Sequence, residues 1–163
     1  MLLLRLVSIV LTLAWGLWFG GIMTLFLAVT SLFNTFAPDR ALAGTAAASV
    51  FRKFERYQLV LAAVTIVAAV AWRMAPSARR GAKTAVLVFV LLAAVLAPVS
   101  TFGVSARIGE LRTQGLTATG EFRRLHGISM ALYATEAVVL LLAGLALSSA
   151  LAAPVVSAPG PKD

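Results

Sequence analysis

The chain has 163 residues, of which 61% are hydrophobic and only 12% are charged, and its formal net charge is +8. A soluble domain has about 45–50% apolar and about 25% charged residues, so this chain carries too little charge to cover a water-facing surface. The absence of cysteine excludes disulfides, thiolate metal sites and cysteine nucleophiles, and the single histidine excludes any site that needs two. The basic residues flank apolar runs, where they meet lipid phosphate, and we therefore expect no nucleic acid partner.

Four stretches of the chain contain no charged residue: 6–38, 57–72, 84–106 and 137–161. An α-helix needs roughly 20 apolar residues to cross a hydrocarbon core of about 30 Å. We therefore predict an all-α fold, an integral membrane four-helix bundle whose first partner is the lipid bilayer.

The predicted bundle occupies almost the whole chain, as a four-span membrane domain over residues 1–153. The tail over 154–163 is rich in Ala, Pro, Gly and Ser and is expected to be disordered. The spans themselves are expected at about residues 5–33, 55–73, 84–103 and 125–151.

The first apolar run follows Arg5 and continues to Phe33. A signal peptide has an apolar region of only about 7–15 residues, so this run is interpreted as an uncleaved first span. Small side chains recur at every fourth position along it, at Ser8, Thr12, Gly16, Gly20 and Thr24.

The Gly16-x-x-x-Gly20 spacing lets two helix backbones approach closely. We expect Gly16, Gly20 and Gly21 to pack against another helix of the same chain. Association with a second copy of the chain through this face is the alternative.

Residues 37–44 are predicted to form a short turn, followed by an amphipathic segment over 45–56 that leads into the second span. The apolar side of this segment is expected to hold Val50, Phe51, Phe54 and Tyr57. Its polar side is expected to hold Arg52, Lys53 and Glu55.

Residues 73–83 form a basic loop between the second and third spans. The residues expected to contact lipid phosphate or to set topology are Arg73, Arg79, Arg80 and Lys83 at this end, and Arg123 and Arg124 at the other.

An even number of spans places both termini on one side of the membrane. That side holds six basic residues and the other holds eight, which favours termini outside, whereas the dense 73–83 loop and the position of Arg5 favour termini inside. We expect cytoplasmic termini. The preference for Arg over Lys and the abundance of Ala favour a bacterial inner (plasma) membrane.

Pro98 lies in the last third of the third span and is predicted to kink it, because proline lacks the backbone donor that the helix needs. The connection over 104–124 has mixed charge, and residues 105–113 are predicted to form a short interfacial helix.

The fourth span contains an ionisable residue, Glu136, about 15 Å beyond His126 at 1.5 Å per residue. A carboxyl group at that depth costs at least about 2.5 kcal/mol, so it normally faces the bundle interior and has a partner. Trp15 and Trp18 lie at a similar depth and their indole N–H groups need acceptors, so one of them is expected to donate to Glu136.

The helical period places four polar side chains of the fourth span within an arc of about 80°: His126, Ser129, Tyr133 and Glu136. This polar stripe favours a lined path or pocket with His126 at its mouth and Glu136 at its bottom. The alternative is a packing face whose polar groups bond to neighbouring helices.

From the remaining polar residues we expect no cofactor, no bound metal and no enzymatic activity. Phosphate-binding loops and a Ser-His-Asp set are missing from the sequence. No metal-ligand spacing joins His126 to the acidic residues that flank the spans, which are Asp39, Glu55, Glu110 and Glu121.

The segment from Phe122 to Ser129, Phe-Arg-Arg-Leu-His-Gly-Ile-Ser, resembles the F-x-x-x-HG-x-S signature of the transmembrane-protein-205-like family, a family of small four-helix membrane proteins with a domain of unknown function. Residues 15–21 resemble the first helix of that family, and residues 51–57 resemble the start of its second. The resemblance implies a four-helix membrane protein and carries over to His126, Gly127 and Ser129. Gly127 has its own physical interpretation, because the missing side chain would let a neighbouring helix approach.

These patterns favour a membrane protein that binds or transports a small solute or a proton through the polar stripe. The alternative is a scaffold or assembly subunit that associates with itself or with a membrane partner through the small-residue face of the first helix. A third function, as a membrane enzyme on lipids, would need a nucleophile or metal that the sequence does not indicate.

Overall fold

The structure is a computed structural model that describes residues 2–75 and 80–152. Its helices are α1 (Leu2–Thr35), α2 (Arg40–Met74), α3 (Arg80–Pro98), the π-helix η1 (Val99–Ser105), α4 (Ala106–Thr113) and α5 (Gly120–Ala152). The predicted all-α bundle is confirmed, and α4 is the short helix expected at 105–113. The tail 154–163 lies outside the described residues.

Four helical stretches are long and apolar enough to cross a membrane: Leu2–Thr35, Arg40–Met74, Arg80–Thr113 and Gly120–Ala152. Each has 33 to 35 residues, which corresponds to about 50 Å at 1.5 Å per residue. Because a hydrocarbon core is only about 30 Å thick, the helices extend beyond it.

The turn between α1 and α2 is shorter than the 37–44 segment that the sequence suggested. Asp39 ends it as the N-cap of α2, where its Oδ1 accepts a hydrogen bond of 2.9 Å from the backbone N–H of Leu42. A carboxylate in this position satisfies one of the free donors of the first helical turn, so α2 begins at Arg40.

The third spanning stretch changes its helical form at Pro98. The α-helix ends at that residue and continues as the π-helix Val99–Ser105 before α4 begins. Proline provides no N–H for the α-helical pattern, and a wider turn is one way to absorb the missing bond. The structure therefore shows a change of hydrogen-bond register after Pro98, and the kink expected there stays a prediction.

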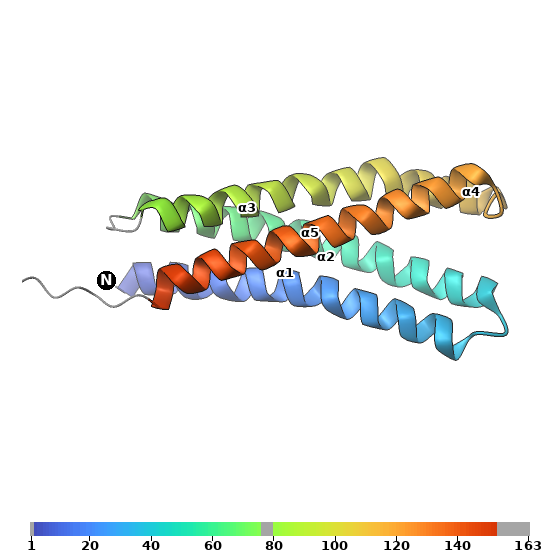
Figure 1. The fold of residues 1–163 in the computed structure, drawn as a ribbon, viewed down its shortest axis with the longest axis horizontal. Coiled ribbons are helices and arrows are strands. Elements are labelled where there is room, and N and C mark those ends of the chain that lie inside the picture. Colours follow the sequence, from blue (N-terminus) through green and yellow to red (C-terminus); the bar gives the residue numbers. More distant parts are fainter. Residues whose placement is uncertain (1, 76–79, 153–163) are drawn as a thin grey trace, which may run out of the picture.

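Two helix pairs make up the bundle, α1 with α2 and the α3–η1–α4 stretch with α5 (Figure 1). The pairs meet at the end that holds the start of α1, the end of α2 and the start of α3, and they splay apart at the end that holds the turns after α1 and after α4 (Figure 1). Both the N-terminus and the end of α5 lie at the closed end, as four spans require (Figure 1).

The closed end is packed with apolar side chains. Its cluster of buried residues consists of Leu11, Ala68, Ala69, Trp72, Val86, Val90, Ala143, Leu147 and Ala150. Large apolar side chains also cover the outer surface, with Leu27, Val67 and Leu145 between 61% and 72% exposed. An apolar exterior on a bundle of this length is the surface that lipid would cover.

At the closed end, α1 is joined to α5 by Trp15. Its indole Nε1 donates a hydrogen bond of 2.7 Å to the backbone carbonyl of Leu140. The ring lies over Gly144, where an added Cβ would be only 2.6 Å from Cη2 and 2.7 Å from Cε2 of Trp15. Gly144 is therefore the residue that lets the indole reach the backbone of α5.

We expect Gly144→Ala to lower the stability of the bundle by about 1–3 kcal/mol, because the new methyl group overlaps a rigid ring. The measurement is thermal or denaturant unfolding of the protein in a mild detergent. Gly127→Ala is the matched control on the same helix, since no described atom outside its own helical turn comes within 4 Å of a Cβ there. Equal stability of the two variants would contradict the packing described for Trp15.

Candidate functional site

The polar stripe predicted on the fourth span faces the interior of the bundle. Tyr133 and Glu136 are fully buried on α5, and Ser129 is 7% exposed. His126, one turn before Ser129, is exposed and stacks on Phe122 with 6.3 Å between ring centroids. The stripe therefore runs from an exposed imidazole to a carboxyl group in the core.

Glu136 is held by a tryptophan of α1. The indole Nε1 of Trp18 donates a hydrogen bond of 2.9 Å to Oε1 of Glu136, and both side chains are completely buried. This confirms the expectation that Trp15 or Trp18 donates to Glu136, with Trp18 in that role. The second carboxyl oxygen, Oε2, has no hydrogen-bond partner among the described residues.

Glu55 is also buried, and we call Glu55, Tyr133 and Glu136 together the polar column. The prediction that Glu55 lies on the outer side of its helix is therefore wrong. Its side chain is only 6% exposed, and its Oε1 accepts a hydrogen bond of 3.3 Å from the hydroxyl of Tyr133. The rings of Phe51 and Phe54 pack at tilted angles against Tyr133 and cover this pair.

A signal for Glu55 was present in the sequence. Glu55, Gln58 and Thr65 are spaced by three and seven residues, which places them on one face of α2, and all three are buried. The polar face of α2 thus meets the polar stripe of α5. The assignment of Glu55 to the outside followed from its neighbours Arg52 and Lys53, which are both exposed.

Five buried polar atoms of α2, η1 and α5 have no hydrogen-bond partner among the described residues. Among the described residues they are both polar atoms of Gln58, Oγ of Ser100, Oγ1 of Thr101 and Oε2 of Glu136. Ser100 lies close to Tyr133 in a geometry that makes no hydrogen bond. Most buried polar atoms in proteins have a partner, so atoms of this kind are candidates for binding water or a polar ligand.

A cavity of about 460 Å³ lies between the splayed helix pairs and ends at this column. Its walls come from α1, α2, η1, α4 and α5, and its polar lining includes Asn34, Arg52, Glu55, Arg112, His126 and Ser129. Along α2 the lining runs from Gly44 to Glu55, which is about 16 Å at 1.5 Å per residue. We call this space the wedge cavity.

The wedge cavity is bridged near its wide end by Arg112. Its Nη1 donates a hydrogen bond to the backbone carbonyl of Gly44, so α4 is tied to the first turns of α2. The guanidinium also lies 5.9 Å from the ring centroid of Phe122. These contacts hold the walls at a fixed separation.

Beyond Glu136 the polar column stops. The described buried residues of α5 from Leu140 onwards have no polar side chain, and three of them, Ala143, Leu147 and Ala150, belong to the apolar cluster at the closed end. The polar interior is therefore continuous with the wide end of the bundle and closed off from the other end.

The basic residues expected to contact lipid phosphate or to set topology differ in their exposure. Lys83 is 5% exposed; its Nζ donates to the carbonyls of Trp72 at 2.9 Å and Ala75 at 3.1 Å, and it lies over the Trp72 ring. Lys83 thus caps the end of α2 within the chain, and its assignment to lipid phosphate or topology stays a prediction. Arg73 donates to the hydroxyl of Thr84 at 2.8 Å.

The other basic residues of that prediction remain at the surface. Arg80, Arg123 and Arg124 are exposed at the two ends of the bundle. Arg79 lies outside the described residues.

The glycines of the predicted packing faces behave differently from one another. An added Cβ at Gly21 would be 2.8 Å from the ring of Phe54, so Gly21 does allow close approach of α2. At Gly16, Gly20 and Gly127, no described atom of another helix comes within 4 Å of such a Cβ. The expected packing within the chain is therefore found at Gly21 and not at the other three.

No three His, Asp or Glu side chains within residues 2–75 and 80–152 lie close enough to share a metal ion. The arrangement holds two buried carboxyl groups, a phenol and an amide next to a cavity. Such groups can accept and release protons and can hydrogen-bond a small polar solute.

A family model described as a domain of unknown function, DUF4149, matches residues 13–117. The match runs from α1 through α4 and ends before α5. It includes the segments at 15–21 and 51–57 that carry part of the family resemblance, whereas the HG-x-S element at 126–129 lies beyond it. No curated protein and no solved structure matches the chain.

The bond between Trp18 and Glu136 should appear as a coupling energy of about 1 kcal/mol in a double-mutant cycle. The variants are Trp18→Phe, Glu136→Met and the double variant, and the measurement is unfolding in a mild detergent. Trp18→Phe alone leaves a buried carboxyl oxygen without its donor, so it should destabilise more in the presence of Glu136 than in the presence of Met. Additive effects would contradict a direct bond.

Proposed function

The chain belongs to the DUF4149 family, a domain of unknown function, and we propose that it is a non-enzymatic carrier that binds a proton, or a small solute together with a proton, at Glu136 through the wedge cavity. We further propose that the finer assignment is to the transmembrane-protein-205-like group, which the segments at 15–21, 51–57 and 126–129 support. The integral membrane location follows from its four candidate spans.

The observation that carries this proposal is the position of Glu136. Its carboxyl group is fully buried, it has one donor in Trp18, and its second oxygen has no described partner. A carboxyl group in the hydrocarbon region is costly to keep, and such groups in membrane proteins mark ion and proton pathways. If Trp18 only joined α1 to α5, a backbone carbonyl would be a sufficient acceptor for its indole N–H, as the carbonyl of Leu140 is for Trp15.

The wedge cavity supports binding from one side of the membrane. His126 and Ser129 line it, and the Tyr133–Glu55 pair separates it from Glu136. We propose that this pair acts as the inner gate, since the Tyr133 hydroxyl bonds to Glu55 at the cavity and Tyr133 lies one turn before Glu136 on α5. With cytoplasmic termini, which we propose on the basis of the basic 73–83 loop, the cavity opens to the outside of a bacterial plasma membrane.

A carrier needs a second state in which the closed end opens. The splayed helix pairs support a rocking motion, because the described hydrogen bonds between α1 and α5 come from Trp15 and Trp18 alone. Opening of the closed end would then require the α2–α3 side to separate, where Lys83 ties the two helices.

We expect Glu136→Gln to reduce proton uptake to the level of protein-free liposomes, because the amide keeps the acceptor for Trp18 but cannot ionise. The measurement is the fluorescence of a pH dye trapped in liposomes after an imposed pH step. Glu121→Gln is the matched control, since Glu121 is a surface residue paired with Arg107 at 3.0 Å. The proposal would be contradicted if liposomes with the wild-type protein took up protons no faster than protein-free liposomes. It would also be contradicted if the Glu136→Gln variant took up protons as fast as the wild type.

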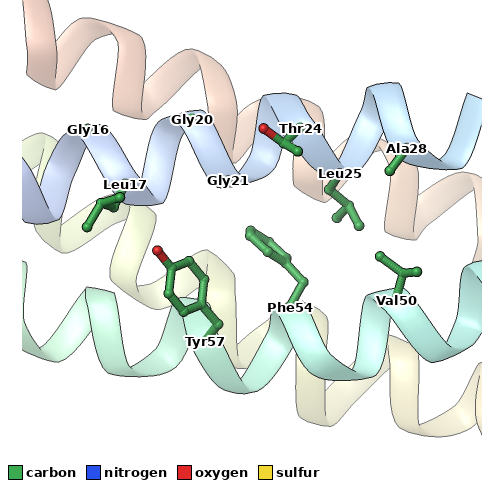
Figure 2. A pocket seen from close by; sticks show the side chains of 10 residues that line it. All are labelled: Gly16, Leu17, Gly20, Gly21, Thr24, Leu25, Ala28, Val50, Phe54 and Tyr57. Carbon is green, nitrogen blue, oxygen red and sulfur yellow. The ribbon is translucent and has the colours of Figure 1, made fainter.

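A second candidate function, as a self-associating assembly subunit, is favoured by one feature of α1. A groove of about 410 Å³ lies between α1 and α2, and its lining on α1 includes Gly16, Gly20 and Gly21 (Figure 2). The side chains of Leu17, Thr24 and Tyr57 stand at its edges (Figure 2). Because Gly16 and Gly20 have no close neighbour among the described residues, this face is open to a helix of a second copy.

If the groove mediates association, Gly20→Leu should convert a dimer into a monomer, since the new side chain fills the contact surface. The measurement is the mass of the protein in mild detergent, by crosslinking or native mass spectrometry. Gly103→Leu, at an exposed glycine outside the groove, should leave the mass unchanged. A wild-type protein that is strictly monomeric would overturn this second candidate.

A further inference from the structure

The wedge cavity has walls of two kinds. Its charged side chains come from α2 and α4, and most of the remaining lining is apolar, with Val29, Phe33, Phe51, Ile108 and Met130 contributed by four different helices. A ligand that fills it must therefore offer both a polar group and an apolar body. Its volume of about 460 Å³ falls in the usual range of about 300–1,000 Å³ for small-molecule sites.

Two guanidinium groups face this cavity together. Arg52 of α2 and Arg112 of α4 both line it, and they are close enough for their charges to repel. Arg112 uses one N–H on the carbonyl of Gly44, and Arg52 makes no hydrogen bond with any described residue. Several N–H donors of the two guanidinium groups therefore remain for an anion, which arginine binds through paired N–H groups.

The one acidic residue of the lining does not cancel this charge. Glu55 lies at the inner end of the cavity, its Oε1 accepts the Tyr133 hydroxyl, and its side chain is 6% exposed. The lining contains two arginines and one glutamate, and it also contains His126. An anionic group is therefore favoured in the outer part of the cavity.

Small residues provide the remaining space. Gly44, Ala47, Ala48 and Gly109 all line the cavity, and a Cβ added at Gly109 would meet no described atom of another element within 4 Å. The bare surface along α2 and α4 leaves room for a chain of several carbon atoms beside the apolar side chains. A free inorganic anion would leave this part of the cavity unused.

We propose that the wedge cavity binds an anionic amphiphile, with its phosphate or carboxylate group held by Arg52 and Arg112 and its hydrocarbon tail against the apolar wall. This inference rests on the proposed function in that it names the solute class at the entrance to Glu136. An anion that enters with a proton also keeps the charge change in the membrane small.

The test is binding of decyl phosphate to the full chain in a nonionic detergent, followed by native mass spectrometry. One molecule should bind per chain, at least about tenfold more tightly than inorganic phosphate or decyltrimethylammonium. Arg52→Gln should weaken binding of decyl phosphate about tenfold, whereas Arg56→Gln, at an exposed position one turn along α2 and outside the lining, should not change it.

Gly109→Leu provides a second variant that tests the cavity without touching a charge. The leucine side chain should fill the space and abolish binding while the fold is kept, because a helical glycine replaced by leucine gains helix propensity. Gly127→Leu, at an open position outside the lining, is its control.

Four results would overturn the proposal: equal binding of decyltrimethylammonium, equal binding of inorganic phosphate, or unchanged binding of decyl phosphate to Arg52→Gln or to Gly109→Leu. Glu136→Gln should bind decyl phosphate as the wild type does. If the wild type binds decyl phosphate but takes up no protons, the proposed proton function is wrong and the ligand class stands. If it takes up protons but does not bind decyl phosphate, the ligand class is wrong and the proton function stands.

Discussion

The hydrogen bond between Trp18 and Glu136 is the constraint on which the arrangement of the bundle depends. A carboxyl group at this depth needs a donor, and the nearest one comes from the first helix, 118 residues away along the chain. Trp15 adds a second contact of the same kind, with Gly144 making room for its ring. Together the two tryptophans hold α1 against α5 over one half of their length. The other half has no such contacts, so the helix pairs separate there and enclose the wedge cavity.

The same constraint explains why polar residues collect where they do. Tyr133 lies one turn from Glu136 on α5, and the helix opposite presents Glu55 and Gln58 to it. A polar group that faces lipid finds no water to hydrogen-bond with. Inside a bundle, several polar groups can instead bond to one another. The apolar cluster around Trp72 and Lys83 closes the other end, so the column has an entrance on one side only.

Much of this architecture could be predicted from the sequence. The lengths of the charge-free stretches predicted four helices, and depth along the spans predicted the partner of Glu136. Pro98 predicted a kink in the third span, whereas the π-helix that follows it was not predicted. The burial of Glu55 and Lys83 could not be predicted in the same way, because it depends on how each helix is rotated about its axis and on which neighbour it meets. Gly16 and Gly144 show the same limit. Both are glycines in apolar helices, and only the position of Trp15 in three dimensions makes the second one a packing residue and leaves the first one open.

The central claim is that water reaches the polar column from the wide end of the bundle and is excluded beyond Glu136. The chain has no cysteine, so single cysteines can be introduced without background. Ser129→Cys lies on the wall of the wedge cavity, and Leu140→Cys lies one turn beyond Glu136 on the same helix. Rates of reaction with a small, charged thiol reagent, measured on protein in liposomes, should be fast for the first and undetectable for the second. An unreactive cysteine at 129, or equal rates at both positions, would contradict the account.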